Sequence, residues 1–490
     1  KVQVSYRAHM VLFHSTDLNP CEVSDLPGIP ESGAAQQASV KQVPPEERPD
    51  KDDGEGDKDS ALENGLQKLL TSVIPCRSVY QVVLLRSMER QRIQSAGGKW
   101  TPVNGLRLVL KLAEADDCVL TVSNCVLMPE SDREESHWAI YRGSSAVSPS
   151  FSTHSRQKTW NHSMCLACMD QPATPGEHEF HVATNAGSFN SRFVVSPEKQ
   201  PRHLLAVVFP AFQASWVEDD EPQVVEPGIW RDIEGLYEVV TTLPGDRVLV
   251  ICTLRYVASW ASEQNRGRFT INRDEYGLDG PHSRGLQSVR ALGPNLPRVA
   301  LMATVDQPQP GPHVYRARAA VTAGCTTGVT AVLSGGRQLA LVRLPAGIVV
   351  GPNLSQGPVT IEEERWSELP GLEVVVMLRR PRDRVMIIYH TDCCPQDYHY
   401  KAHFTVFRRS GTAGQTCNLG FSQDFGLEMV CSDYAASSEF PVGIFCDVPG
   451  GVGMHSYSVC ARADKTGASS NSSAITVGYS GSITAVVLSS

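Results

Sequence analysis

Long hydrophobic runs are missing from this sequence of 490 residues. The longest, at residues 374–378 and 204–210, are far shorter than the roughly 18 consecutive apolar residues that suggest a membrane-spanning helix. We therefore expect a protein that does not insert into a membrane.

An excess of basic residues is missing as well. Lysine and arginine number 44 against 53 aspartates and glutamates, so the formal net charge is −9 at pH 7. Proteins hold a phosphate backbone mainly with lysine and arginine. The charge balance therefore argues against nucleic acid as a partner.

Signatures of common enzyme classes are also missing. The sequence contains no Gly-x4-Gly-Lys-Ser/Thr loop, no His-Glu-x-x-His pair, no Gly-x-Ser-x-Gly elbow and no Gly-x-Gly-x-x-Gly loop. A Leu-Ser-Gly-Gly stretch at residues 333–336 resembles part of a transport-ATPase signature, but no phosphate-binding loop accompanies it. We predict a protein that is not an enzyme and that has no cofactor.

Cysteine is scarce for a disulfide-linked protein, because 14 cysteines are spread over the chain at irregular spacings. Cys118, Cys252, Cys394 and Cys446 lie in apolar or strand-like stretches, where a thiol behaves as a small hydrophobe. We predict reduced thiols and, from them, a cytoplasmic location.

Four features do occur, and they recur in the same order three times. The first is a tryptophan followed five residues later by a glycine, and the second is an acidic residue that opens an apolar stretch. These features comprise Trp100, Gly105 and Asp117; Trp230, Gly235 and Asp246; and Trp366, Gly371 and Asp383. Each pair of features predicts two consecutive strands.

The third and fourth features predict two further strands in each repeat. The third alternates an aromatic residue, a β-branched residue and an arginine, which places all three on one strand face. The fourth is an aspartate and a proline, followed by a histidine two positions before an aromatic residue. The members are Arg142, Asp170 and His178; Arg273, Asp306 and His313; and Arg408, Asp447 and His455.

The tryptophans are 130 and 136 residues apart, which is the length of a domain. We predict modules at residues 91–213, 214–349 and 350–490, preceded by a partial module at residues 1–90. The partial module contains an acidic insert at residues 28–65, which we expect to be disordered, and a short amphipathic helix at residues 61–73. Short proline-containing connectors predict an elongated array of modules.

Each module contains about eight short strand candidates separated by turn residues, a pattern typical of an all-β fold. We predict tandem two-sheet β-sandwiches with jelly-roll or Greek-key connections. The Trp-x4-Gly-Leu opening and the Gly-x-His-x-aromatic strand resemble the jelly-roll modules of the complement-C1q and tumour-necrosis-factor type. The resemblance implies compact sandwiches used for protein contact, which in that family trimerise through an aromatic-rich face. No collagen-like or coiled-coil stalk is visible in this sequence.

The recurring polar residues have two interpretations. His178, His313 and His455 could be ligands or bases, but the same position in every module favours a structural role. The recurring aspartates suit turns, and the recurring arginines suit either contacts with an acidic peptide or simple solvation. Arg379, Arg380, Arg382 and Arg384 also make the third module locally basic, which suits an acidic partner or a solvated face.

Two groups of residues resemble metal sites. Cys165 and Cys168 are three residues apart, so on a strand they would point to opposite faces and could not share an ion. The denser group is His390, Asp392, Cys393, Cys394, His399 and His403, whose side chains suit zinc or copper. Only the third module contains this group, and we predict an ordinary polar hairpin without a metal.

Together these features predict a non-enzymatic structural or scaffolding protein. Its partners would be other proteins of a larger assembly, such as the cytoskeleton or the axoneme of a cilium. The alternative is an extracellular or virion protein that binds a ligand or receptor through its loops. Disulfides or a glycan on Asn161 would favour the alternative, and stoichiometric zinc lost with His399 and His403 would indicate an enzyme. The sequence leaves the oligomeric state open.

Overall fold

A computed structural model describes residues 80–489 of the chain. The description omits residues 88–89, 95–98, 131–134, 155–161, 187–191, 196–201, 226–227, 259–265, 280–284, 291–297, 322–330, 334–335, 362–364, 396–399, 411–414, 421–427, 433–440 and 465–474. The acidic insert at residues 28–65 and the helix expected at residues 61–73 lie outside the described residues. Every described strand belongs to one compact unit, Cys76–Ser490.

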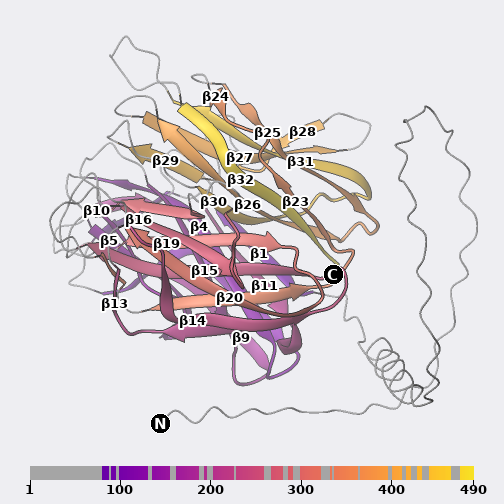
Figure 1. The fold of residues 1–490 in the computed structure, drawn as a ribbon. Helices are drawn as coiled ribbons and strands as arrows, with labels where there is room; N and C mark the ends of the chain where they lie inside the picture. Colours follow the sequence, from indigo (N-terminus) through magenta and orange to yellow (C-terminus); the bar gives the residue numbers. More distant parts are fainter. Residues whose placement is uncertain are drawn as a thin grey trace, which may run out of the picture. The chain divides into compact units, whose positions relative to one another are not determined.

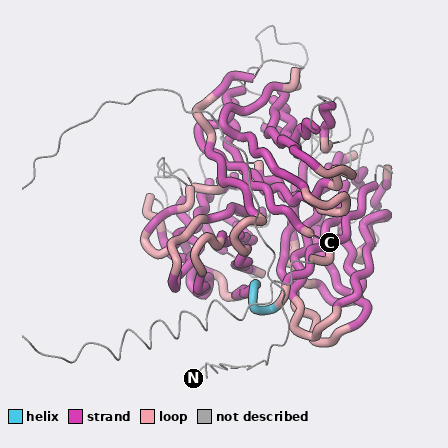
Figure 2. Tube along the Cα trace, turned by 90° about the vertical axis from the view of Figure 1, so that its right-hand side faces the viewer, coloured by secondary structure: helices cyan, strands magenta, loops and turns pink. Residues whose placement is uncertain are grey.

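The described residues form three β-sandwiches in chain order, so the predicted all-β class is confirmed (Figures 1 and 2). Strands of the first sandwich are β1 Val82–Ser87, β2 Gln91–Gln94, β3 Thr101–Leu112, β4 Cys118–Pro129, β5 Glu135–Arg142, β6 Ser145–Ala146, β7 Phe151–His154, β8 His162–Asp170, β9 Gly176–Ala186, β10 Arg192–Val195 and β11 Arg202–Phe209.

A short 3₁₀ helix, η2 Ala211–Gln213, leads into the second sandwich. Strands of the second sandwich are β12 Ala214–Asp219, β13 Gln223–Val225, β14 Arg231–Thr242, β15 Arg247–Ala258, β16 Arg266–Arg273, β17 Tyr276–Gly277, β18 Gln287–Arg290, β19 Arg298–Asp306, β20 Gly311–Val321, β21 Ala331–Leu333 and β22 Arg337–Leu344.

The third sandwich contains the remaining strands, drawn in orange to yellow in Figure 1. They are β23 Val349–Leu354, β24 Val359–Ile361, β25 Ser367–Leu378, β26 Arg384–Pro395, β27 Tyr400–Ser410, β28 Gln415–Asn418, β29 Glu428–Ser432, β30 Val442–Asp447, β31 Gly453–Ala463 and β32 Ile475–Leu488. No helix among the described residues is long and apolar enough to cross a membrane.

Each sandwich pairs two antiparallel sheets with the same strand order. One sheet, here called the inner sheet, contains β1-β11-β4-β8 in the first sandwich, β12-β22-β15-β19 in the second and β23-β32-β26-β30 in the third. The other, called the outer sheet, contains β3-β9-β5, β14-β20-β16 and β25-β31-β27. Consecutive long strands alternate between the two sheets, as in jelly-roll and Greek-key sandwiches.

The sequence pattern of a strand follows the sheet to which it belongs. Strand β3 of an outer sheet alternates buried and exposed residues, because one face packs on the core and the other meets solvent. Strand β11 of an inner sheet is buried along its whole length. Strands of the inner sheets such as β11 and β30 are therefore covered on both faces.

The first strand of the first sandwich differs from the sequence-based assignment. Residues 1–90 were expected to form a separate partial module, but β1 pairs with β11 over six residues from Val82 to Ser87. Strands β12 and β23 pair with β22 and β32 in the same way. Strand β1 is therefore the first inner strand of the first sandwich.

Four apolar clusters stabilise the described unit. Three lie chiefly inside single sandwiches. The fourth, here called the shared cluster, combines residues of all three inner sheets. Equivalent positions supply it: Leu120, Leu249 and Met386; Val122, Ile251 and Ile388; Met169, Val305 and Cys446; and Val207, Val342 and Val486.

The shared cluster corrects one expectation. We expected sandwiches in an elongated array, joined only by short connectors, but their inner sheets bury a common apolar surface instead. Burying apolar side chains stabilises an interface by about 25 cal/mol per Å². The covering of the inner sheets is thus provided by the neighbouring sandwiches.

Candidate functional site

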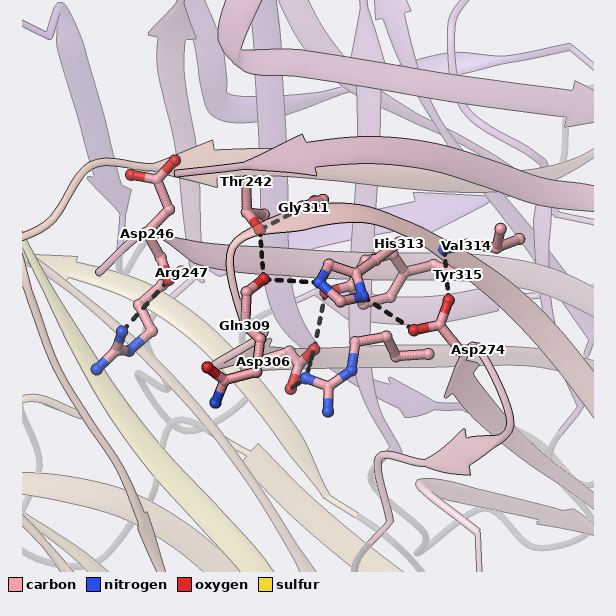
Figure 3. Close-up of polar contacts among 11 residues, drawn as sticks. Thr242, Asp246, Arg247, Asp274, Asp306, Gln309, Gly311, His313, Val314 and Tyr315 are labelled. Carbon is pink, nitrogen blue, oxygen red and sulfur yellow. Dashed lines mark hydrogen bonds and ion pairs between the residues drawn. The ribbon is translucent and has the colours of Figure 1, made fainter. Parts of the chain in front are cut away.

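The recurring arginine and aspartate of the second sandwich form one site (Figure 3). Arg273 ends β16 and Asp306 ends β19, and the Arg273 Nη1 atom lies 2.8 and 2.7 Å from the two carboxylate oxygens of Asp306. The Tyr315 hydroxyl on β20 donates to Asp306 Oδ2 over 2.7 Å. Burial, together with the Asp306 charge, raises the pKa of Tyr315 well above its usual value, so the hydroxyl keeps its proton and donates.

His313 of the same sandwich stabilises two turns through its two ring nitrogens. Its Nδ1 atom lies 2.9 Å from Asp274 Oδ2, and its Nε2 atom lies 2.7 Å from the carbonyl oxygen of Gln309. The second oxygen of Asp274 accepts the Val314 N–H over 2.9 Å. The hydrogen bond from His313 lowers the pKa of Asp274, and Figure 3 shows the whole chain of contacts.

The arginine–aspartate pair recurs in the other sandwiches. Arg142 Nε lies 2.8 Å from Asp170 Oδ2, and Arg408 Nη1 lies 2.7 Å from Asp447 Oδ2. A tyrosine hydroxyl, that of Tyr457, again donates to the aspartate of the third sandwich over 3.0 Å. Burial raises the pKa of Asp170 in the first sandwich, where no tyrosine hydroxyl occupies the equivalent position.

The recurring histidines also keep one contact in every sandwich. His178 and His455 approach the carbonyl oxygens of Thr174 and Gly451 at 2.7 and 3.3 Å, each four residues earlier, as His313 does. The sequence thus predicted the recurring aspartates, arginines and histidines, but treated them separately. The structure brings them together at the end of each sandwich, where they fix turns.

The recurring tryptophans lie half-buried beside the outer sheets. The rings of Trp100 and Tyr141 are 5.6 Å apart, and those of Trp366 and Phe407 are 5.8 Å apart. Trp230 instead lies under the guanidinium of Arg268, at 5.5 Å. An aromatic ring therefore packs beside the tryptophan in the first and third sandwiches, and an arginine takes that place in the second.

The recurring glycines occupy bulges in the first outer strand. Gly105, Gly235 and Gly371 have φ angles of 73°, 76° and 82°, which favour glycine. Strand register shifts across each of them. A Cβ atom on Gly105 would lie 2.8 Å from Ser87, and one on Gly371 would overlap the carbonyl oxygen of Leu354.

The metal-like group of the third sandwich is not brought together. His390 lies on the inner strand β26, where its Nδ1 atom is 3.1 Å from the Ser482 hydroxyl. His403 lies on the outer strand β27 and pairs with Asp464 at 2.8 Å. Cys393 packs in the core of the third sandwich, and His399 lies outside the described residues. Among the residues that the structure describes, no group of three or more could hold a metal ion.

Several described thiols lie in apolar surroundings, as the sequence predicted. Cys118, Cys252 and Cys446 are buried. Cys165 packs against the shared cluster and Cys168 lies in the core of the first sandwich, so the prediction of opposite faces is confirmed. Burial raises the pKa of Cys125 and of Cys446 to about 12, which keeps these thiols protonated.

A second recurring set, which the sequence analysis missed, lies between the sandwiches. Asn124 Nδ2 donates to the carbonyl oxygen of Ile444 in the third sandwich over 3.2 Å. Thr253 Oγ1 donates to the carbonyl oxygen of Ala167 in the first sandwich over 2.9 Å. His390 bonds the backbone of Ala303 in the second sandwich.

The three contacts form a closed ring of equivalent positions. Asn124, Thr253 and His390 each lie seven residues after the recurring acidic residue that precedes the second strand. Their acceptors each lie three residues before the recurring aspartate that ends β8, β19 or β30. Each sandwich thus makes one side-chain hydrogen bond to the backbone of one neighbouring sandwich and receives one from the other. We call Asn124, Thr253 and His390, with their acceptors, the polar ring.

Each member of the polar ring also has a polar partner on the adjacent strand. His203 lies opposite Asn124, Gln338 opposite Thr253 and Ser482 opposite His390. The Gln338 side chain receives the Met169 N–H over 2.6 Å and donates to the Met169 carbonyl over 2.8 Å, again across sandwiches. A polar residue at a fixed position in an otherwise apolar strand was the signal that could have revealed the ring.

His390 of the polar ring and His203, the partner of Asn124, are both buried. Burial, reinforced by the nearby charge of Arg86, lowers the pKa of His203 to about 3. Burial lowers the pKa of His390 to about 4. The Asn124 Nδ2 atom lies 2.7 Å from His203 Nε2, a contact in which the amide donates to an unprotonated nitrogen.

No protein-family model and no curated protein matches this chain. Solved structures similar to it include that of the Sulfolobus turreted icosahedral virus, with 10% identity, a TM-score of 0.17, and coverage of 84% of this chain and 92% of that one. The tandem CBM22 domains of Paenibacillus barcinonensis Xyn10C have 10% identity, a TM-score of 0.16, and coverage of 55% and 94%. A putative secreted protein from Parabacteroides distasonis has 8% identity, a TM-score of 0.15, and coverage of 56% and 92%. At these TM-scores none of the likenesses carries an argument about function.

Proposed function

We propose that this chain is a non-enzymatic structural protein whose three sandwiches form a preassembled scaffold for other proteins. The observation that carries the proposal is the shared cluster closed by the polar ring. Protein-contact surfaces combine such an apolar centre with satisfied hydrogen bonds. Strands of the inner sheets such as β11 and β30 are buried in this contact, so the outer sheets and the turns remain for partners.

The resemblance to C1q and tumour-necrosis-factor modules supports this proposal at the level of architecture. Modules of that type associate in threes, and here three sandwiches with one strand order bury a common surface within one chain. The buried surface is mostly aliphatic, with Tyr80 and Phe209 as its fully buried aromatic members. One covalent chain fixes the order of the three sandwiches, which separate chains could not do.

A structural role is also supported by how the titratable residues are used. The recurring aspartates, arginines and histidines bond each other or the backbone, and the thiols of Cys125, Cys252 and Cys446 are buried as small apolar groups. With the irregular cysteine spacing, we propose a location in a reducing compartment, such as the cytoplasm and its cytoskeletal or ciliary assemblies.

The test is chemical cross-linking of the intact chain in extracts of its own cells, followed by mass spectrometry. We expect stoichiometric protein partners, with cross-links on the outer sheets and connecting turns and few on the inner sheets. Thiol mapping of the same material should find the cysteines reduced. A chain without protein partners, cysteines paired in disulfides or a glycan on Asn161 would contradict the proposal.

A further inference from the structure

One end of the third sandwich differs from the equivalent ends of the other two. Met377 of β25 lies opposite Met454 of β31 on the solvent-facing side of the outer sheet, with 57% and 55% of their surfaces exposed. Val375 lies two residues before Met377 on the same face and is 48% exposed. These three side chains form a continuous apolar strip.

The fold does not require apolar residues at this place. The equivalent pair in the first sandwich is Lys111 opposite Glu177, and both are exposed. In the second sandwich it is Thr241 opposite Pro312. The same backbone is therefore compatible with a charged pair. The fold alone does not explain why the third sandwich has two exposed methionines at these positions.

Two turns extend the strip at its end. Leu378 pairs with Gly453, and Val385 pairs with Asp447, so the turn at residues 379–383 and the turn at residues 448–452 lie side by side. The second turn exposes Val448 and Val452, at 48% and 58%.

The first turn carries the charge. Arg379, Arg380 and Arg382 are exposed, and within the described part of the chain Arg379 and Arg380 make no ion pair. The equivalent turn of the first sandwich carries the opposite charge, with Glu114 and Asp116 exposed. The basic character is therefore also specific to the third sandwich.

We propose that this surface, comprising Val375, Met377, Met454, Val448, Val452 and the arginine turn, binds an acidic amphipathic segment of a partner protein. The proposal rests on the proposed scaffold function and names the partner chemistry of one of its faces. Exposed apolar groups next to exposed cations suit a ligand with apolar side chains on one face and carboxylates beside them. Methionine adapts its shape to such ligands.

The alternative of a membrane surface fits less well. Interfacial lipid contacts favour tryptophan and tyrosine, and the exposed apolar residues of this surface are all methionine or valine. The strip also lies on a sheet face beside the turns, which suits a segment laid along it. A protein segment is therefore the ligand that the side chains favour.

The experiment measures binding of labelled synthetic peptides to the full-length chain by fluorescence anisotropy. The probe is a helical peptide with leucine on one face and glutamate on the other. Two matched peptides replace the glutamates by lysine or the leucines by serine. We expect the probe to bind, the matched peptides to bind at least about tenfold more weakly, and salt to weaken binding of the probe.

Variants of the chain locate the binding. Met377→Lys with Met454→Glu installs the pair found in the first sandwich, and Arg379→Ser with Arg380→Ser removes two exposed charges of the turn. Each double variant should lose about tenfold or more in affinity. Val239→Lys, an equally exposed position of the second sandwich without a basic turn, is the control and should bind like the native chain. Unchanged circular dichroism and melting would show that the exposed substitutions leave the fold intact.

Several outcomes would overturn the proposal. These are equal binding of the lysine peptide, equal binding by the double variants, binding to anionic phosphatidylserine vesicles in place of the probe, and self-association through this surface in light scattering. If the probe does not bind and the cross-linked partners map elsewhere, this surface is not a binding site. The proposed scaffold function would then still hold. The scaffold function itself would fall if the intact chain cross-linked to no partner.

Discussion

The sequence can show that a residue recurs without showing its role. This is the case for Arg273, Asp306 and Tyr315. Period two placed the arginine on one strand face with an aromatic and a β-branched residue, and we expected it to contact an acidic peptide or to be solvated. In the structure the guanidinium instead pairs with the aspartate at the end of the core. A half-buried carboxylate is costly without a partner. The recurrence therefore reflects a shared structural requirement of the three sandwiches.

The tyrosine of this group can be tested against a natural control. Phe180 occupies the position of Tyr315 in the first sandwich, so Tyr315→Phe removes one hydrogen bond without leaving a cavity. We expect it to lower the free energy of unfolding by about 1 kcal/mol. Arg273→Ala removes the ion pair of Asp306, which keeps the hydrogen bond from Tyr315, and should cost more, about 1 to 3 kcal/mol. Urea denaturation of both variants checks the order, and equal costs would contradict it.

The buried histidine of the polar ring, His390, predicts a pH dependence. The pKa of His390 is lowered to about 4, whereas an unfolded chain has an ordinary histidine pKa of about 6.5. The unfolded chain therefore binds protons first as the pH falls, so stability is complete above about pH 6.5 and declines toward about pH 4. His390 should contribute a slope of about 1.4 kcal/mol per pH unit in that window.

The variant His390→Asn removes the titrating group and should flatten this slope. Its stability at pH 7 is a separate quantity, because the hydrogen bonds to Ser482 and Ala303 change as well. Denaturation at a series of pH values measures the slope directly. An unchanged slope would contradict the assignment to His390.

The bulge of the first outer strand is the clearest feature at the scale of elements. Sequence spacing predicted a strand after each recurring tryptophan, but it gave no reason for the glycine five residues later. The reason is a positive φ together with a close neighbour, which for Gly371 is the carbonyl oxygen of Leu354. The bulge lets the outer strand approach the first strand of the inner sheet.

A pair of glycine substitutions separates the two causes. Gly371→Ala combines strained backbone with a steric overlap and should lower the free energy of unfolding by about 2 to 4 kcal/mol. Gly450 has a similar φ of 74°, but a Cβ atom there would meet nothing within 4 Å. Gly450→Ala should therefore cost only about 1 kcal/mol. Thermal or urea unfolding of both variants decides, and an equal loss would show that the overlap is relieved.

The shared cluster determines behaviour at the scale of the whole molecule. Because Met386, Ile388 and Val486 are buried mainly by the other two sandwiches, the third sandwich alone would expose them to water. A contiguous apolar face of this kind drives association. The stability of each sandwich should therefore depend on its neighbours.

We predict that residues 349–490 expressed alone self-associate, because association buries the apolar face of the inner sheet that the other two sandwiches would otherwise cover. Ile388→Asp in that fragment should reduce the association. In the intact chain Ile388→Ala should lower the free energy of unfolding by about 2 to 5 kcal/mol. Analytical ultracentrifugation of the fragment and calorimetry of the chain measure these effects, and a monomeric fragment would contradict the prediction.

How much the sequence predicted depends on whether a feature is local. The strands opened by Asp117, Asp246 and Asp383, the all-β class and the opposite faces of Cys165 and Cys168 follow from alternation and turn chemistry, which the chain encodes residue by residue. The partners of those strands follow from pairing at long sequence separation. For that reason β1 was placed in the wrong module.

The sequence by itself determined a repeated β-rich unit and the residues that each copy shares, because strand alternation, turns and bulges depend on neighbouring residues. Only the tertiary structure decided how the copies meet. The role of the polar residues Asn124, Thr253 and His390 follows from their hydrogen bonds to the backbone of other sandwiches, far away in the sequence. The sequence shows that these polar residues recur at one position, but it does not show which carbonyl group each one bonds. The order and contact of the three sandwiches therefore became visible only when the inner sheets were seen packed together.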